Sequence, residues 1–186
     1  MELDKAIKER HSVRRFTSKK PSYEEIIAAI DAANSAPLAG NIPTLKFILV
    51  SDAAKINKIA EACQQDFVAQ ANYLVVICSD SAQAVRSYGE RGRMYTRQQA
   101  GAAIENFLLK ITDMGLGTCW TGAFVDSMIK QVLVIPDNID VEAVLPMGYE
   151  MPKAGKQRKK TDLSAILFFN KWKEKYMKPW KKPEAI

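Results

Sequence analysis

Two runs of consecutive apolar residues most constrain the fold of this chain. They are Phe-Ile-Leu-Val at residues 47–50 and Leu-Val-Val-Ile-Cys at residues 74–78. Each run is too short for a buried helix but has the length of a buried strand. A third strand is expected over residues 144–149, and segments with helical spacing of apolar residues lie before, between and after these runs. The interleaved order predicts a sheet covered by helices, in the α/β or α+β class.

Several of the expected helices have recognisable ends. Ser22, followed three residues later by Glu25, is the signature of a capping box at a helix N-terminus. Asp52 and Asp126 are each expected to cap a further helix. The longest strong helical pattern covers residues 100–114 and ends where glycines begin.

Composition limits the class of protein. The chain has 186 residues, of which 47% are hydrophobic and 26% are charged, as in a single globular domain. No apolar run approaches the roughly 20 residues that a membrane helix needs, so no membrane partner is expected. The first residues lack an apolar signal-peptide core, which favours a cytoplasmic location. Three widely spaced cysteines and a single histidine predict neither a disulfide framework nor a metal site.

The net charge of +6 is concentrated near the C-terminus. Residues 1–152 contain 16 basic and 18 acidic side chains, whereas residues 153–186 contain 11 basic and 3 acidic ones. Such a basic tail is compatible with phosphate, nucleic acid or a membrane surface as a partner. A solvated surface is the simpler interpretation of most of its lysines.

Two polar motifs occur in the first quarter of the chain. Residues 10–16 read Arg-His-Ser-Val-Arg-Arg-Phe. Guanidinium groups and a hydroxyl suit phosphate oxygens, although an exposed basic turn has the same composition. Residues 36–41 read Ala-Pro-Leu-Ala-Gly-Asn. Small side chains would let a planar ligand approach the backbone, and Asn41 offers donors and an acceptor, but an ordinary helix-to-strand connection is equally compatible.

Two further motifs follow. Residues 115–124 read Gly-Leu-Gly-Thr-Cys-Trp-Thr-Gly-Ala-Phe. This is not a Rossmann dinucleotide fingerprint, because it follows a helix rather than a strand and its glycine spacing differs. It is a tight segment of small residues with exposed backbone N–H groups. Residues 155–160, Gly-Lys-Gln-Arg-Lys-Lys, are compatible with a phosphate site or a localisation-type basic patch.

Together and in this order, the four motifs resemble the FMN-dependent nitroreductase family. The resemblance extends from Arg10 to about Trp172, and the motifs at residues 10–16 and 115–124 are its most specific parts. It implies an α+β fold with a central mixed sheet covered by helices, assembled as a domain-swapped homodimer with FMN at the subunit interface. Residues 1–165 would form the FMN-binding domain, and residues 166–186 would form an arm that packs on the partner subunit.

The resemblance also implies which residues hold FMN. Arg10, together with Lys156 and Arg158, would bind the phosphate. The ribityl chain and the pyrimidine edge would lie along the rest of the first motif, and Asn41 would bond the isoalloxazine ring. The whole expected set is Arg10, His11, Ser12, Arg14, Pro37, Leu38, Ala39, Asn41, Gly122, Ala123, Lys156 and Arg158. No catalytic side chain is expected, because the flavin performs the redox chemistry.

The activity implied is passage of hydride from NADH or NADPH through N5 of FMN to a small acceptor such as a nitroaromatic or a quinone. Arg14 is the candidate for stabilising the reduced anion. Many family members continue Asn-x-Gln-Pro-Trp where this chain reads Asn-Ile-Pro-Thr-Leu at residues 41–45, and the stretch over residues 79–99 is short. The first departure removes a glutamine and a tryptophan expected near the flavin and so leaves the substrate undefined, whereas the short second stretch predicts an open flavin face.

Two alternatives remain open from the sequence. The first is another flavin reaction on the same fold, either reductive dehalogenation or flavin cleavage. The second is a basic module that binds nucleic acid through its tail. The second is disfavoured because aromatic residues are not interleaved with lysines on a strand in the pattern that stacks bases.

Overall fold

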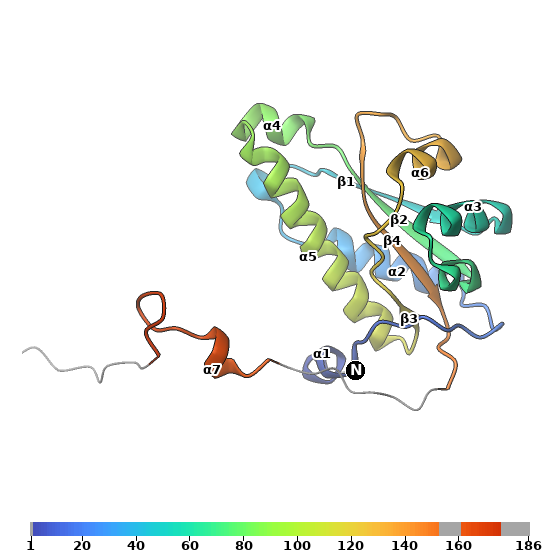
Figure 1. Cartoon of the computed structure of the whole chain (residues 1–186), viewed down its shortest axis with the longest axis horizontal. Helices are drawn as coiled ribbons and strands as arrows, with labels where there is room; N and C mark the ends of the chain where they lie inside the picture. Colours follow the sequence, from blue (N-terminus) through green and yellow to red (C-terminus); the bar gives the residue numbers. More distant parts are fainter. Residues whose placement is uncertain (1, 153–160, 176–186) are drawn as a thin grey trace, which may run out of the picture. The chain divides into compact units, whose positions relative to one another are not determined.

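The computed structural model describes residues 2–152 and 161–175 (Figure 1). The chain divides into two compact units, residues 1–152 and 153–186. The predicted arm, from residue 166, belongs to the second unit. The predicted phosphate ligands Lys156 and Arg158 lie outside the described residues.

The first unit contains a four-stranded sheet. Its strands, in spatial order, are β1 (Leu45–Val50), β2 (Tyr73–Ser79), β4 (Asp140–Gly148) and β3 (Gly117–Thr118). Every pairing among the described strands is antiparallel. The α+β class is therefore confirmed, whereas the expected mixed sheet is wrong for this part of the chain. Each connection between neighbouring strands returns the chain in the opposite direction, as antiparallel pairing requires.

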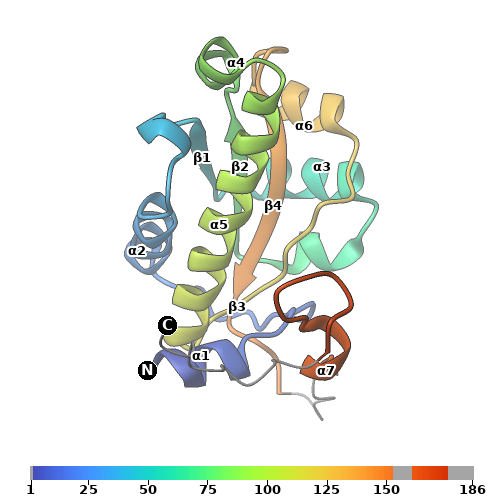
Figure 2. The ribbon, with the colours of Figure 1, turned by 90° about the vertical axis from the view of Figure 1, so that its left-hand side faces the viewer.

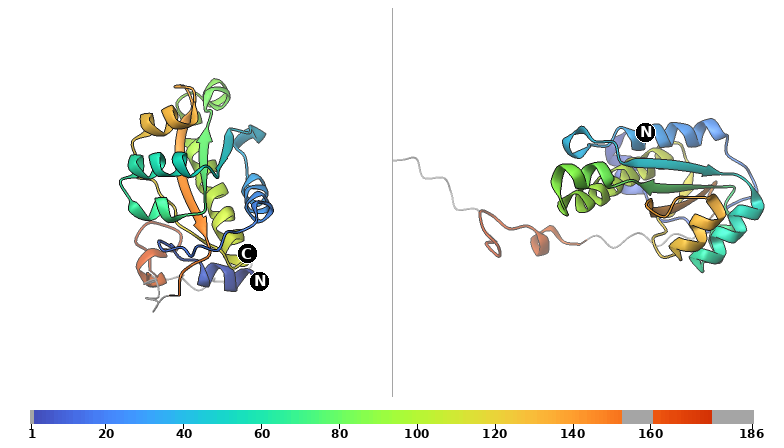
Figure 3. Two further views of the ribbon diagram at one scale, coloured as in Figure 1. Left: turned by 90° about the vertical axis from the view of Figure 1, so that its right-hand side faces the viewer. Right: turned by 90° about the horizontal axis from the view of Figure 1, so that it is seen from above.

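Helices cover both faces of this sheet. They are α1 (Leu3–Glu9), α2 (Tyr23–Asn34), α3 (Ala53–Cys63), α4 (Ala82–Tyr88), α5 (Arg91–Asp113) and α6 (Asp126–Leu133), with 3-10 turns η1 (Ala39–Asn41) and η2 (Asp66–Gln70). Strand β2 is buried along its whole length. Its side chains Leu74 and Val76 belong to the core formed with α3 and α6. The alternate side chains, Val75 and Ile77, belong to the core formed with α2 and α5 (Figure 3). The apolar run at residues 74–78 thus fills two cores at once.

The predicted helix ends are partly confirmed. The Ser22 hydroxyl accepts from the N–H of Glu25 at 3.3 Å, and the Glu25 carboxylate accepts from the N–H of Ser22 at 2.8 Å, which completes the capping box. Asp52 caps α3 as expected. The expected cap at Asp126 is wrong, because the N-cap of α6 is Val125. The Asp126 carboxylate instead accepts a hydrogen bond from a backbone N–H of β4 at 3.3 Å.

Helix α5 begins at Arg91, well before the expected residue 100. Its first half has few apolar residues, so the sequence pattern does not reveal it. Gly92 is buried against the backbone of α4, so the packing of the two helices decides where α5 starts. Among the described residues, no helix has the length and apolar character needed to cross a bilayer.

The described part of the second unit is a short helix followed by an aromatic pair. Helix α7 (Leu163–Ile166) is capped by Asp162. The rings of Phe168 and Trp172 pack with centroids 4.7 Å apart, and the ammonium of Lys175 lies 4.3 Å from the Phe168 centroid. Large apolar side chains remain exposed here, with Trp172 77% exposed. Packing of this segment on a partner subunit stays a prediction.

Candidate cofactor site

The arginine-rich segment that follows α1 is tied to the sheet by its backbone. The N–H of Val13 donates to the carbonyl of Thr118 in β3 at 2.9 Å, and the N–H of Thr17 donates to the carbonyl of Tyr149 after β4 at 2.8 Å. Val13 and Phe16 are buried. The exposed members of the segment are His11, Ser12, Arg14 and Arg15. The anchored backbone therefore presents a row of polar side chains to solvent.

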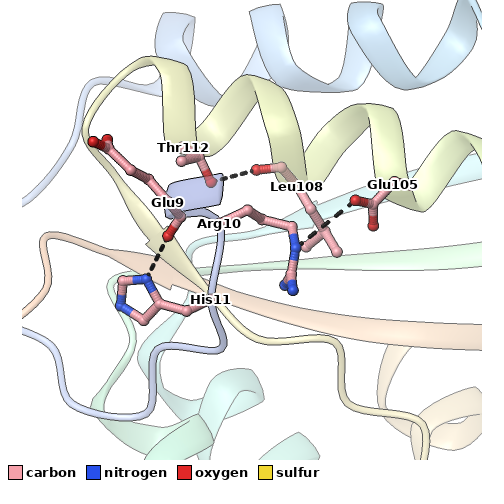
Figure 4. A network of polar contacts seen from close by, with 6 residues as sticks. All are labelled: Glu9, Arg10, His11, Glu105, Leu108 and Thr112. Atoms are coloured by element: carbon pink, nitrogen blue, oxygen red, sulfur yellow. Dashed lines mark hydrogen bonds and ion pairs between the residues drawn. The ribbon is translucent and has the colours of Figure 1, made fainter. Parts of the chain in front are cut away.

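Polar neighbours hold Arg10 and His11 (Figure 4). Nε of Arg10 lies 3.8 Å from Oε1 of Glu105 in α5, and the Arg10 side chain is 14% exposed. Nδ1 of His11 lies 2.8 Å from the carbonyl oxygen of Glu9, and its Nε2 lies 2.8 Å from Oε2 of Glu150. The imidazole therefore links the end of α1 to the segment after β4. Arg10 points its guanidinium along the side of α5.

The glycine-rich segment that follows α5 crosses the sheet and presents backbone donors. Thr121 pairs with Val144 of β4, and the N–H of Val125 bonds to a carbonyl of α3. Between these two anchors, Gly122 and Ala123 are exposed. Within residues 2–152 and 161–175, neither of their N–H groups donates to a protein acceptor. Two backbone donors are therefore available to a bound molecule.

The turn after α3 brings a glutamine to this same place, which the sequence interpretation missed. Nε2 of Gln65 donates to the carbonyl oxygen of Ala123 at 3.4 Å. Two residues further on, the ring of Phe67 lies 5.7 Å from the Arg14 guanidinium carbon. The turn after α3 thus meets the glycine-rich segment through Gln65 and the arginine-rich segment through Phe67. The left-handed backbone at Gln64, with φ of 51°, turns the chain to place Gln65 there, and no sequence motif marks it.

The small-residue loop lies toward the opposite end of α5. Gly40 faces the hydroxyl of Tyr88 at the end of α4, whereas Arg10 faces Glu105. Helix α4 packs where α5 begins, and α1 packs along its C-terminal half (Figure 2). Tyr88 packs on Tyr95, and at 1.5 Å per residue Tyr95 and Glu105 are about 15 Å apart along α5. Among the described residues, no hydrogen bond or ion pair joins the loop of Pro37, Leu38, Ala39 and Asn41 to Arg10, Ser12, Arg14, Gly122 or Ala123.

The sequence profile of the nitroreductase family matches residues 7–67 and 61–149, which together cover most of the chain. This chain belongs to the nitroreductase family. A relative from Archaeoglobus fulgidus, named as an NADH dehydrogenase/NAD(P)H nitroreductase, is 32% identical over 150 residues, covering 78% of this chain and 83% of the relative.

A relative in Bacillus subtilis is an FMN reductase (NADPH). It is 26% identical over 161 residues, covering 78% of this nitroreductase-family chain and 65% of the relative. A crystal structure of a Bacteroides thetaiotaomicron protein of similar name to the Archaeoglobus relative superposes with a TM-score of 0.80 at 30% identity. It covers 91% of this chain and 98% of that one.

Proposed function

We propose that this chain is an FMN-dependent oxidoreductase that takes hydride from NADPH or NADH and delivers it to a small acceptor such as a nitroaromatic or a quinone. The pair of N–H groups at Gly122 and Ala123, which have no acceptor among the described residues, carries the proposal, because the backbone is anchored on both sides of them at Thr121 and Val125. Family membership and the FMN reductase relative support it.

The residues on this side of the molecule suit a flavin. Bound FMN would supply the redox chemistry that no side chain of this group offers. The N–H groups of Gly122 and Ala123 would donate to the ring near N5. Arg14 would place positive charge at its N1–C2 edge, where negative charge develops on reduction. Gln65 holds the carbonyl of Ala123 and thereby fixes the direction of these donors.

The phosphate would bind to Arg10. Its Nε faces Glu105 at 3.8 Å, which is longer than a hydrogen bond, so both terminal nitrogens remain available for phosphate oxygens. Ser12 adds a neutral donor two residues later. The predicted contributions of Lys156 and Arg158 belong to the same proposal.

A homodimer would complete the site. Gly40 of the small-residue loop lies against Tyr88 near the start of α5, whereas Arg10 lies against Glu105, so a second copy would supply Pro37, Leu38, Ala39 and Asn41 to the flavin. The exposed apolar side chains of α1 and α2 favour such an assembly. They are Leu3, Ile7, Tyr23 and Ile27, which are 50–64% exposed. A cytoplasmic location, with no nucleic acid or membrane as partner, stays part of the proposal.

Reconstitution with FMN tests this function. The purified protein should show flavin absorbance and should oxidise NADPH or NADH in the presence of a quinone or nitroaromatic. Arg10→Ala should weaken FMN binding about tenfold to a hundredfold, as expected for a lost charge-assisted contact. Arg15→Ala is the matched control, because its exposed guanidinium contacts only Met151 among the described residues.

Three outcomes would contradict the proposal. Failure of the purified protein to bind added FMN would rule out FMN as its cofactor. Equal FMN affinities for the Arg10 and Arg15 variants would remove Arg10 from the site. Loss of the flavin spectrum during turnover, or release of halide from a halogenated acceptor, would instead indicate flavin cleavage or dehalogenation.

A further inference from the structure

The arginines of the first unit occur in two groups, and only one belongs to the proposed flavin site. Arg10, Arg14 and Arg15 form the first group. Four more arginines lie between residues 86 and 97, and there are none from residue 16 to residue 85. The second group surrounds the junction of α4 and α5, in a unit whose acidic side chains otherwise outnumber its basic ones. Its positive charge has no role in the function proposed above.

Close packing of the two helices fixes the geometry of this junction. Gly92 is buried against the backbone of Ala84 and Val85, and a β-carbon at this position would collide with both. Only glycine permits this approach. Arg91 and Arg93, on either side of Gly92, are therefore held at fixed positions beside α4 and exposed to solvent.

Among these arginines, Arg93 has internal acidic neighbours. Arg93 has Glu90 at 3.9 Å and lines a surface pocket with Asp137 and Asp140. Within the described residues, Arg86, Arg91 and Arg97 make no ion pair, and of these three Arg91 is the one at the start of α5. It also occupies the first turn of α5, where a positive charge opposes the helix dipole. A bound anion would offset this unfavourable interaction.

The anion would be held by side chains rather than by the helix end. The N–H of Gly92 already donates to the carbonyl of Gly89 at 2.9 Å, and that of Arg93 donates to Glu90 at 3.3 Å. The guanidinium of Arg91 remains as the free donor, and its planar fork matches phosphate oxygens. Arg91 therefore marks the place where the phosphate would sit.

An exposed aromatic ring lies next to this charge. Tyr88 is 40% exposed and packs edge-on against Tyr95, with ring centroids 5.3 Å apart. Tyr95 and Arg91 are four residues apart on α5 and share one side of the helix. The hydroxyl of Tyr88 faces Gly40, in the loop proposed to lie along the isoalloxazine ring. An aromatic pair and an exposed arginine are thus neighbours on α4 and α5, and Tyr88 lies against the loop that would contact the flavin of the partner subunit.

We infer that Arg91, with the ring of Tyr88, binds the adenosine 2′-phosphate half of NADPH, so that the enzyme prefers NADPH to NADH. The inference rests on the proposed function and names its reductant. NADPH differs from NADH only by its 2′-phosphate. An arginine without an ion pair at the edge of the site would therefore favour binding of NADPH. The adenine would pack on Tyr88 while the nicotinamide reaches the flavin.

Steady-state kinetics of the FMN-loaded enzyme test the inference. The KM for NADPH should lie well below that for NADH. Arg91→Ala should raise the KM for NADPH about tenfold to a hundredfold and leave the KM for NADH within about twofold. Arg93→Ala is the matched control, because its charge is already offset by Glu90, Asp137 and Asp140. Raising the salt concentration should weaken the binding of NADPH more than the binding of NADH.

Calorimetric titration separates this inference from the proposed function. Adenosine 2′,5′-bisphosphate should bind the wild-type protein and should lose affinity in Arg91→Ala, whereas 5′-AMP and inorganic phosphate should bind weakly to both. Equal KM values for NADPH and NADH, or equal binding of the bisphosphate to both proteins, would overturn the role of Arg91 while leaving the flavin enzyme intact. Absence of FMN binding or of turnover with either nucleotide would count against the proposed function, and the titration would still decide whether Arg91 binds the bisphosphate.

Discussion

Replacing Gly117 with alanine should displace the arginine-rich segment from the sheet. A β-carbon at Gly117 would lie 2.8 Å from Cγ1 of Val13 and 2.9 Å from its Cβ and Cγ2. Favourable carbon contacts occur at about 3.5–4.0 Å, so Val13 would have to move by about 0.6–1 Å. Val13 is 2% exposed and cannot turn into solvent without leaving the core. The strain would therefore pass to the backbone bond between Val13 and Thr118.

The size of the effect follows from two opposed terms. Overpacking of a filled core costs about 1–3 kcal/mol. Alanine has less conformational entropy than glycine in the unfolded chain, which raises the free energy of unfolding by about 0.4–1 kcal/mol. Gly117→Ala should therefore lower the free energy of unfolding by about 1–2 kcal/mol. The same displacement would move Arg10 and Arg14, so FMN affinity should fall about tenfold, which corresponds to about 1.4 kcal/mol.

Urea unfolding of the apoprotein at fixed concentration, and fluorescence titration of FMN, measure these two quantities. Gly101→Ala is the matched control, because a β-carbon there would lie 3.9 Å from the Trp120 ring, at an ordinary contact distance. That variant should be neutral or more stable, since alanine favours a helix by about 1 kcal/mol over glycine. A Gly117→Ala protein with wild-type stability and wild-type FMN affinity would refute the argument.

Three further predictions concern other parts of the chain. Truncation after Thr161 should abolish both dimer formation and FMN binding. A truncated protein that sediments as a yellow dimer would contradict the packing of residues 166–186 on the partner subunit. Burial raises the pKa of both the Cys63 and Cys78 thiols to about 11, so neither should react with a disulfide reagent at pH 8 until the protein is unfolded. The thiols of the unfolded chain ionise at a pKa of about 8.5, below the folded-state pKa. The free energy of unfolding should therefore be unaffected by these groups below about pH 8.5 and should fall as the pH rises toward 11, which alkaline unfolding curves would detect. Ser22→Ala should lower the free energy of unfolding by about 1 kcal/mol through loss of the α2 cap, and an unchanged urea midpoint would contradict this.

The local sequence determined those features whose cause is itself local. The apolar runs at residues 47–50 and 74–78 both form strands, but only β2 is buried along its length and fills a core on each side, whereas β1 lies at the edge of the sheet and is partly exposed. Ser22 caps α2 because its partner Glu25 lies one helical turn away. The motif at residues 10–16 presents its polar side chains outward because Val13 and Phe16 are drawn into the core.

Tertiary structure alone decided the features that join distant segments. Helix α5 begins at Arg91 because Gly92 packs on α4, and nothing in the pattern of its polar first half required this. Asp126 is not the cap of α6, and its carboxylate instead accepts from a backbone N–H of β4 and pairs with Lys130 at 2.8 Å. Gln65 reaches Ala123, 58 residues later in the chain, because the sheet and α3 bring both segments to one side of the molecule. The periodicity of side chains in the sequence indicates only which face of a helix or strand is buried. Contacts between residues far apart in the chain depend on how whole helices and strands pack against one another.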